Sequence, residues 1–180
     1  MTSQSPFSRI LAVCSGAGAG DGAGPDGPAP DGDNSDAATL RLAGALAGAQ
    51  GARLTALAPV PAPSARFFDL THDAEAVRRD LRARAQTRLQ RAVEATLPDQ
   101  TVELEVRTGK PFLATVQAAI DGGHDLVVKA AEELDGLARH LPASTDQHLL
   151  RKCPATVWLH RPGAAARPRR VLAAVDVDPD

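Results

Sequence analysis

The sequence has 180 residues, of which 43% are hydrophobic, and this is enough for one domain with a hydrophobic core. Its formal net charge of −2 gives no electrostatic case for nucleic acid or a membrane surface as a partner. Its two cysteines, Cys14 and Cys153, stand in apolar contexts, and neither a signal peptide nor an apolar run of about 20 residues is recognisable, so we expect a cytoplasmic protein with free thiols.

The first third of the chain predicts two strands with a helix between them. Residues 9–14 form a continuous apolar run, which is typical of a strand covered on both faces. Residues 16–35 are rich in Gly, Asp and Pro, and this composition predicts a flexible, solvated insertion. A helix is expected over residues 36–49, with Asp36 as its N-cap. The second strand, residues 53–59, ends at a group of prolines.

The middle of the chain continues this alternation. Apolar residues at helical spacing predict a long helix over residues 73–97. Alternating apolar and polar residues predict a strand over residues 101–107. Pro111 then suits the first turn of a helix that covers residues 112–120.

The last third predicts one more strand–helix–strand unit. A short apolar run at residues 126–128 is followed by a polar loop, by Ser144 as an N-cap, and by a helix over residues 145–152. Residues 156–159 form the last strand. Five strands therefore alternate with four helices, which predicts a parallel α/β sheet covered on both faces. Ligands of such sheets bind beyond the carboxyl ends of the strands, so we expect any ligand at the loop before Ser144.

The segment HLLRKCPATVW, residues 148–158, carries a resemblance to a known family. It resembles universal stress protein domains, and most closely the first domain of the tandem, E-type branch. The resemblance covers about residues 8–161. It implies a five-stranded parallel sheet in the order 3-2-1-4-5 with helices on both faces, similar to the adenine nucleotide alpha hydrolases.

The resemblance also implies that the nucleotide-binding loop of the family is degenerate in this chain. Nucleotide-binding members have three glycines and a Ser or Thr where this sequence has Ala130, Glu133, Ala143 and Ser144, and an Asp where it has Ser15. Glycine lets backbone N–H groups approach a phosphate closely, and a methyl group restricts that approach. Glu133 would bring a carboxylate near a polyphosphate. We therefore expect no cofactor, with ATP as the alternative.

The end of the sequence repeats its beginning. Residues 162–170, PGAAARPRR, have the composition of a linker. Residues 171–180 open with VLAAVD, which matches the register of ILAVCS at residues 10–15. We expect this segment to be the start of a second, truncated domain, in which Asp176 takes the position of Ser15.

The last strand is the expected interface. In the resembled family this strand lies at the sheet edge and pairs antiparallel with its counterpart, so the expected partner is a second such domain in the same chain or in a homodimer. An apolar edge strand also needs a partner because its backbone groups are otherwise unpaired. The interface residues would be Thr156, Val157, Trp158 and Leu159. In the alternative, Trp158 only packs inward on the helix over residues 145–152.

No motif of the sequence indicates catalysis. The five histidines lack metal-ligand spacing, and neither a nucleophile elbow nor a Gly-Lys-Ser/Thr phosphate loop is present. We expect a domain of a tandem stress-response protein that acts as a non-catalytic scaffold or regulator. The alternatives are an ATP-binding, weakly hydrolysing nucleotide switch and, by analogy of fold, an adenylate-forming or electron-transfer enzyme.

Overall fold

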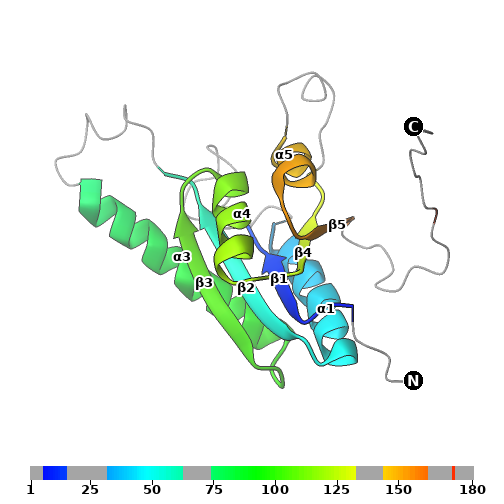
Figure 1. Cartoon of the computed structure of the whole chain (residues 1–180). Coiled ribbons are helices and arrows are strands. Elements are labelled where there is room, and N and C mark those ends of the chain that lie inside the picture. Colours follow the sequence, from blue (N-terminus) through cyan, green and yellow to red (C-terminus); the bar gives the residue numbers. More distant parts are fainter. Residues whose placement is uncertain (1–5, 16–31, 63–73, 133–143, 162–171, 173–180) are drawn as a thin grey trace, which may run out of the picture.

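The fold is the predicted alternation of strands and helices, and a computed structural model describes it for residues 6–15, 32–62, 74–132, 144–161 and 172 (Figure 1). The strands are β1 (Arg9–Val13), β2 (Arg53–Val60), β3 (Val102–Thr108), β4 (Leu126–Ala130) and β5 (Thr156–His160). The helices are α1 (Gly32–Gln50), α3 (Ala74–Thr96), α4 (Pro111–Asp121) and α5 (Thr145–Lys152). The linker 162–170, residues 171–180 apart from Leu172, and most of the predicted insertion lie outside the described residues.

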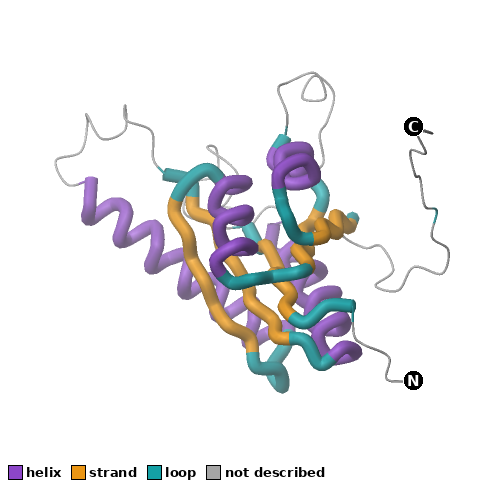
Figure 2. Tube along the Cα trace, viewed as in Figure 1, coloured by secondary structure: helices purple, strands orange, loops and turns teal. Residues whose placement is uncertain are grey.

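The five strands form one parallel sheet in the order β3-β2-β1-β4-β5, which confirms the predicted topology. Helices α1 and α3 pack on one face of this sheet, and α4 and α5 lie on the other (Figure 2). No helix within the described ranges is long and apolar enough to cross a membrane.

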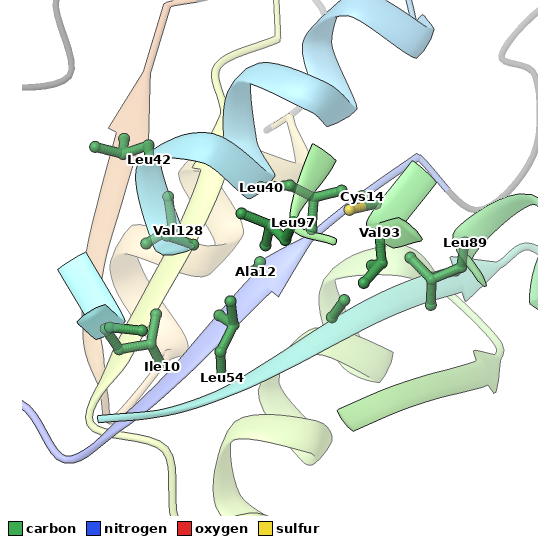
Figure 3. Close-up of a cluster of buried hydrophobic side chains, with 14 of the residues drawn as sticks. Ile10, Ala12, Cys14, Leu40, Leu42, Leu54, Leu89, Val93, Leu97 and Val128 are labelled. Carbon is green, nitrogen blue, oxygen red and sulfur yellow. The ribbon is translucent and has the colours of Figure 1, made fainter. Parts of the chain in front are cut away.

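Strand β1 lies at the centre of the core because both of its faces are covered. Ile10 and Ala12 point into the cluster under α1 and α3, together with Leu40, Leu54 and Val93 (Figure 3). The alternate residues, Leu11 and Val13, belong to the smaller cluster under α4. This two-sided burial explains the unbroken apolar run in the sequence.

Helix α1 begins earlier than the sequence predicted. Its first residue is Gly32, so the prediction that Asp36 is the N-cap is wrong, and Asp36 lies inside the helix. Asp36 is only 5% exposed. Its carboxylate accepts hydrogen bonds from Ser15, which follows β1. The aspartate therefore joins the start of α1 to the end of β1 instead of capping the helix.

The two edges of the sheet differ in charge. Strand β3 carries Glu103, Glu105 and Arg107, and charged side chains on an edge strand discourage pairing with another chain. Strand β5 consists of Thr, Val, Trp, Leu and His and has no Asp, Glu, Lys or Arg. The edge formed by β5 therefore lacks this protection.

Trp158 lies on the face of the sheet opposite to α5. It is partly buried against the cluster under α1 and α3, whereas Val157 packs on the other face with Cys153. The alternative expectation that Trp158 packs on the helix over residues 145–152 is therefore wrong, because the strand turns alternate side chains to opposite faces.

Candidate functional site

The chain reverses its direction of winding between β1 and β4, which are neighbours at the centre of the sheet. Helix α1 leaves β1 toward one face, and the connection after β4 leads to α5 on the other face. In open α/β sheets such a switch point forms the usual ligand crevice. We call the following residues around it the switch-point site: Ser15, Asp36, Lys129, Ala130, Ser144 and Asp146.

On the β1 side of the switch-point site, Ser15 is bound to Asp36. Its backbone N–H and its hydroxyl each donate a hydrogen bond of 2.7 Å to one carboxylate oxygen of Asp36. A carboxylate is therefore present near the end of β1, although position 15 itself is a serine. It comes from α1, and both of its oxygens already accept from Ser15.

On the β4 side, Lys129 and Asp146 form a largely buried ion pair. The Lys129 ammonium lies 2.7 Å from Oδ1 of Asp146, and the two side chains are 15% and 11% exposed. The other oxygen, Oδ2, accepts the backbone N–H of Glu132 at 2.7 Å. Lys129 also donates to the Ala130 carbonyl and lies 3.4 Å from the Glu132 carboxylate. Asp146 thus joins the end of β4 to the first turn of α5.

Ser144 is the N-cap of α5, as the sequence predicted. Its hydroxyl accepts the backbone N–H of Gln147 at 3.3 Å. A helix N-terminus attracts negative charge, and Asp146 supplies that charge from within the first turn. The anion at this helix start is therefore the chain's own carboxylate.

His160, at the end of β5, is held inside the fold. It is 9% exposed, and its Nε2 lies 2.9 Å from the Thr39 hydroxyl of α1. Burial lowers the pKa of His160; a backbone hydrogen bond with Arg161 opposes this effect, and the positive charge of Lys129 adds to it. The neutral imidazole is therefore the favoured form next to the switch-point site.

Neither thiol has the environment of a nucleophile. Burial raises the pKa of Cys14 well above its usual value, and the nearby Asp36 carboxylate raises it further. Burial also raises the pKa of Cys153, although a hydrogen bond with the Ala155 backbone counteracts part of this effect. Both cysteines therefore favour the neutral thiol, which is the less reactive form.

The structure brings together some of the residues that the sequence singled out. Ser15 and Ala130 lie at the carboxyl ends of neighbouring strands, and Ser144 begins α5. Glu133 and Ala143 lie outside the described residues. Within the described part of the chain, no three His, Cys, Asp or Glu side chains are placed to hold a metal ion.

The sequence did not indicate the polar contacts made by Asp36, Thr39, Lys129, Asp146 and His160. An acidic residue in the first turn of a predicted helix is a weak signal that could have drawn attention to Asp146. Nothing comparable marks Lys129 or His160, because their partners come from distant parts of the chain.

Comparison with known proteins gives the family. The family model described as Universal stress protein family matches residues 28–161, and the chain belongs to this family. Universal stress protein E of Escherichia coli (strain K12) is 39% identical over 79 residues, which are 42% of this chain and 25% of that protein. The protein of the same name from Salmonella typhi is 37% identical over 79 residues. The match thus spans about a quarter of the length of these relatives.

Solved structures show the same fold at low sequence identity. A universal stress protein in complex with cAMP has a TM-score of 0.54 and 19% identity, and the match covers 87% of this chain and 98% of that one. Two proteins from Pseudomonas aeruginosa have TM-scores of 0.59 and 0.57 with 18% and 19% identity. The matches cover 90% of this chain and 50% of each of theirs.

The ion pair of the switch-point site gives a prediction about stability. Asp146→Asn should lower the free energy of unfolding by about 2–3 kcal/mol, because it removes the closer carboxylate partner of Lys129 in a mostly dry position and leaves only Glu132, at 3.4 Å. The side-chain amide of the new asparagine can still accept a hydrogen bond from the Glu132 N–H. The loss of stability therefore measures the contribution of the carboxylate charge. In urea unfolding, adding Lys129→Met to Asp146→Asn should cost less than the sum of the two single changes. Additive losses would show that the pair has no net coupling.

His160 gives a prediction about pH. The pKa of His160 is lower in the folded protein than in the unfolded chain, where it is about 6.5. The stability that the neutral imidazole contributes is therefore fully present above about pH 6.5 and is lost as the pH falls through the folded-state pKa. Thermal melting from pH 7.5 to 5 should show this loss, and His160→Gln should flatten the slope. His148→Gln, which keeps His160, is the control and should retain it. An unchanged slope in His160→Gln would contradict the assignment.

Proposed function

We propose that this chain acts as a non-catalytic scaffold or regulatory domain of a cytoplasmic stress-response protein, and that its switch-point site does not bind a nucleotide. The observation that carries the proposal is the internal pairing of the site. Asp36 accepts two hydrogen bonds from Ser15, and Asp146 accepts from Lys129 and from the Glu132 backbone. Four donors at the site, namely the Ser15 N–H and hydroxyl, the Lys129 ammonium and the Glu132 N–H, are thereby engaged within the protein.

Electrostatics argue in the same direction. Asp36 is 5% exposed, so its negative charge beside the switch point is poorly screened by solvent. A polyphosphate would have to displace a carboxylate from its donors or accept its repulsion. Lys129 and Asp146 largely cancel each other's charge across 2.7 Å, so Lys129 offers a polyphosphate little net attraction.

The second candidate function is an ATP-dependent switch. It is favoured by the fold, since a universal stress protein of the same fold was solved in complex with cAMP. It is also favoured by Ser144, the hydroxyl residue that the loop pattern of nucleotide-binding relatives requires. In this alternative the nucleotide would have to break the pairs made by Asp36 and Asp146.

Titration with ATP and Mg²⁺ separates the two functions. We expect calorimetry to show no saturable heat and the melting temperature to stay constant, whereas a ligand at one hundred times its Kd stabilises a fold by about 2.7 kcal/mol. The triple variant Ala130→Gly/Glu133→Gly/Ala143→Gly, with and without Asp146→Asn, tests the cause. Binding that needs Asp146→Asn would identify the internal carboxylate as the obstacle. Saturable binding by the unaltered chain would overturn the proposal.

We further propose that β5 pairs antiparallel with the same strand of a second universal stress protein domain, in the same chain or in a second copy. Support comes from the uncharged edge of β5 and from the partial coverage of longer relatives. The N–H of Thr156 points toward β4 and donates to the backbone carbonyl of Asp125, the residue before that strand. Because backbone groups alternate along a strand, those of Val157 and Leu159 face the open edge.

A proline at this edge tests the pairing. Leu159→Pro should abolish concentration-dependent dimers in sedimentation velocity, because it removes an N–H that faces the edge, while the ladder to β4 stays intact. Leu159→Ala is the matched control: it keeps the N–H and should still dimerise. A Leu159→Pro variant that dimerises like the parent would rule out pairing through β5.

A further inference from the structure

A hollow lies at the opposite end of the sheet from the switch-point site. It has a volume of about 230 Å³ and opens at the amino-terminal ends of β1, β2 and β3. Along β2, Leu57 still packs in the cluster under α4, but the preceding residues of the same face are polar. The argument rests on the lining residues Arg9, Arg53, Thr55, Glu103, Gly122 and His124.

Two arginines, Arg9 and Arg53, line this hollow from neighbouring strands. Arg9 and Arg53 are register partners in β1 and β2, so their side chains leave the same face from neighbouring positions. The Arg9 guanidinium donates to the Gly122 carbonyl at the carboxyl end of α4. Among the described residues, neither arginine forms an ion pair. Like charges in opposed positions destabilise a sheet, and an anion between them would remove that cost.

Two of the three acidic residues that line the hollow form ion pairs with Arg107. Glu105 and Asp121 both bind Arg107, with 2.7 Å between Arg107 Nη1 and Asp121. Asp125, which is close in sequence, accepts hydrogen bonds from Ser8 and from the Arg9 backbone instead. Glu103 remains as the one acid of the lining without an ion pair among the described residues, and its nearest polar contact is the Thr55 hydroxyl at 3.5 Å.

The floor of the hollow is fixed by His124. Its Nδ1 lies 3.1 Å from the Ala118 carbonyl and its Nε2 lies 3.0 Å from the Thr55 hydroxyl, so the ring bridges α4 and β2. The ring also packs directly on Gly122, where an added Cβ would lie 2.2 Å from a ring carbon. The hollow is therefore held in shape by packing and hydrogen bonds before any ligand arrives.

We propose that this hollow binds a small anion whose carboxylate or phosphate group lies between the guanidinium groups of Arg9 and Arg53. The planar guanidinium matches both groups through paired N–H donors. The volume is below that of pockets for drug-sized ligands, which suits inorganic phosphate or a short carboxylic acid. The Glu103 carboxylate of β3 lowers the affinity, because its negative charge repels the bound anion. The site is independent of the nucleotide question at the opposite end of the sheet.

Amide chemical-shift mapping of the whole chain tests the site, with inorganic phosphate and with succinate in separate titrations at constant ionic strength. We expect saturable shifts at Gly122, Gly123 and His124, and the tighter of the two probes identifies the preferred group. Arg53→Gln should weaken binding about tenfold or more, because it removes a charge-assisted contact. Glu103→Gln should tighten binding about twofold or more, since it removes a repulsive charge.

Arg41→Gln is the control, because this exposed residue of α1 gives the same change of net charge on the other side of the sheet. It should leave the affinity unchanged. Arg53 is exposed and unpaired within the described residues, so its replacement should leave the melting temperature in anion-free buffer equal to or above that of the parent. Chemical shifts that rise linearly without saturation, or that change only at the start of α5, would overturn the proposal. So would an equal loss of affinity in Arg41→Gln and Arg53→Gln.

Discussion

The ion pair between Lys129 and Asp146 is the constraint on which the switch-point site depends. It joins the carboxyl end of β4 to the first turn of α5. A helix start beside a strand end normally offers free N–H groups and a positive dipole to an anion. In this chain the negative charge at the start of α5 is the Asp146 carboxylate, and this charge is balanced by Lys129. On the β1 side, the Asp36 carboxylate accepts two hydrogen bonds from Ser15.

The sequence predicted the fold well because strand burial leaves a clear pattern. The unbroken apolar run of β1 and the βαβ alternation indicate a parallel sheet, and the family resemblance supplied the strand order. The start of α1 was missed because Gly, Asp, Asn and Ser are poor helix formers. The partners of Lys129 and His160 could not be predicted, because register and packing bring them together from 17 and 121 residues away.

The two ends of the sheet differ in how their charges are satisfied. At the carboxyl ends of the strands, the buried carboxylates of Asp36 and Asp146 accept hydrogen bonds from Ser15, Lys129 and Glu132. At the amino ends, Arg9 and Arg53 stand side by side, and Arg107 already holds the nearby acids Glu105 and Asp121. The internal pairing at the carboxyl end supports the proposed scaffold role, and the amino end is the proposed site for a small anion.

The measurement that tests the closed switch point most directly is the response of two backbone amides to ATP and Mg²⁺. The N–H groups of Ser15 and Glu132 donate to Asp36 and Asp146, and a bound phosphate would have to take them over. We expect the amide chemical shifts of both residues to stay constant up to millimolar nucleotide. Saturable shifts of both amides, with the same Kd, would contradict the internal closure of the site.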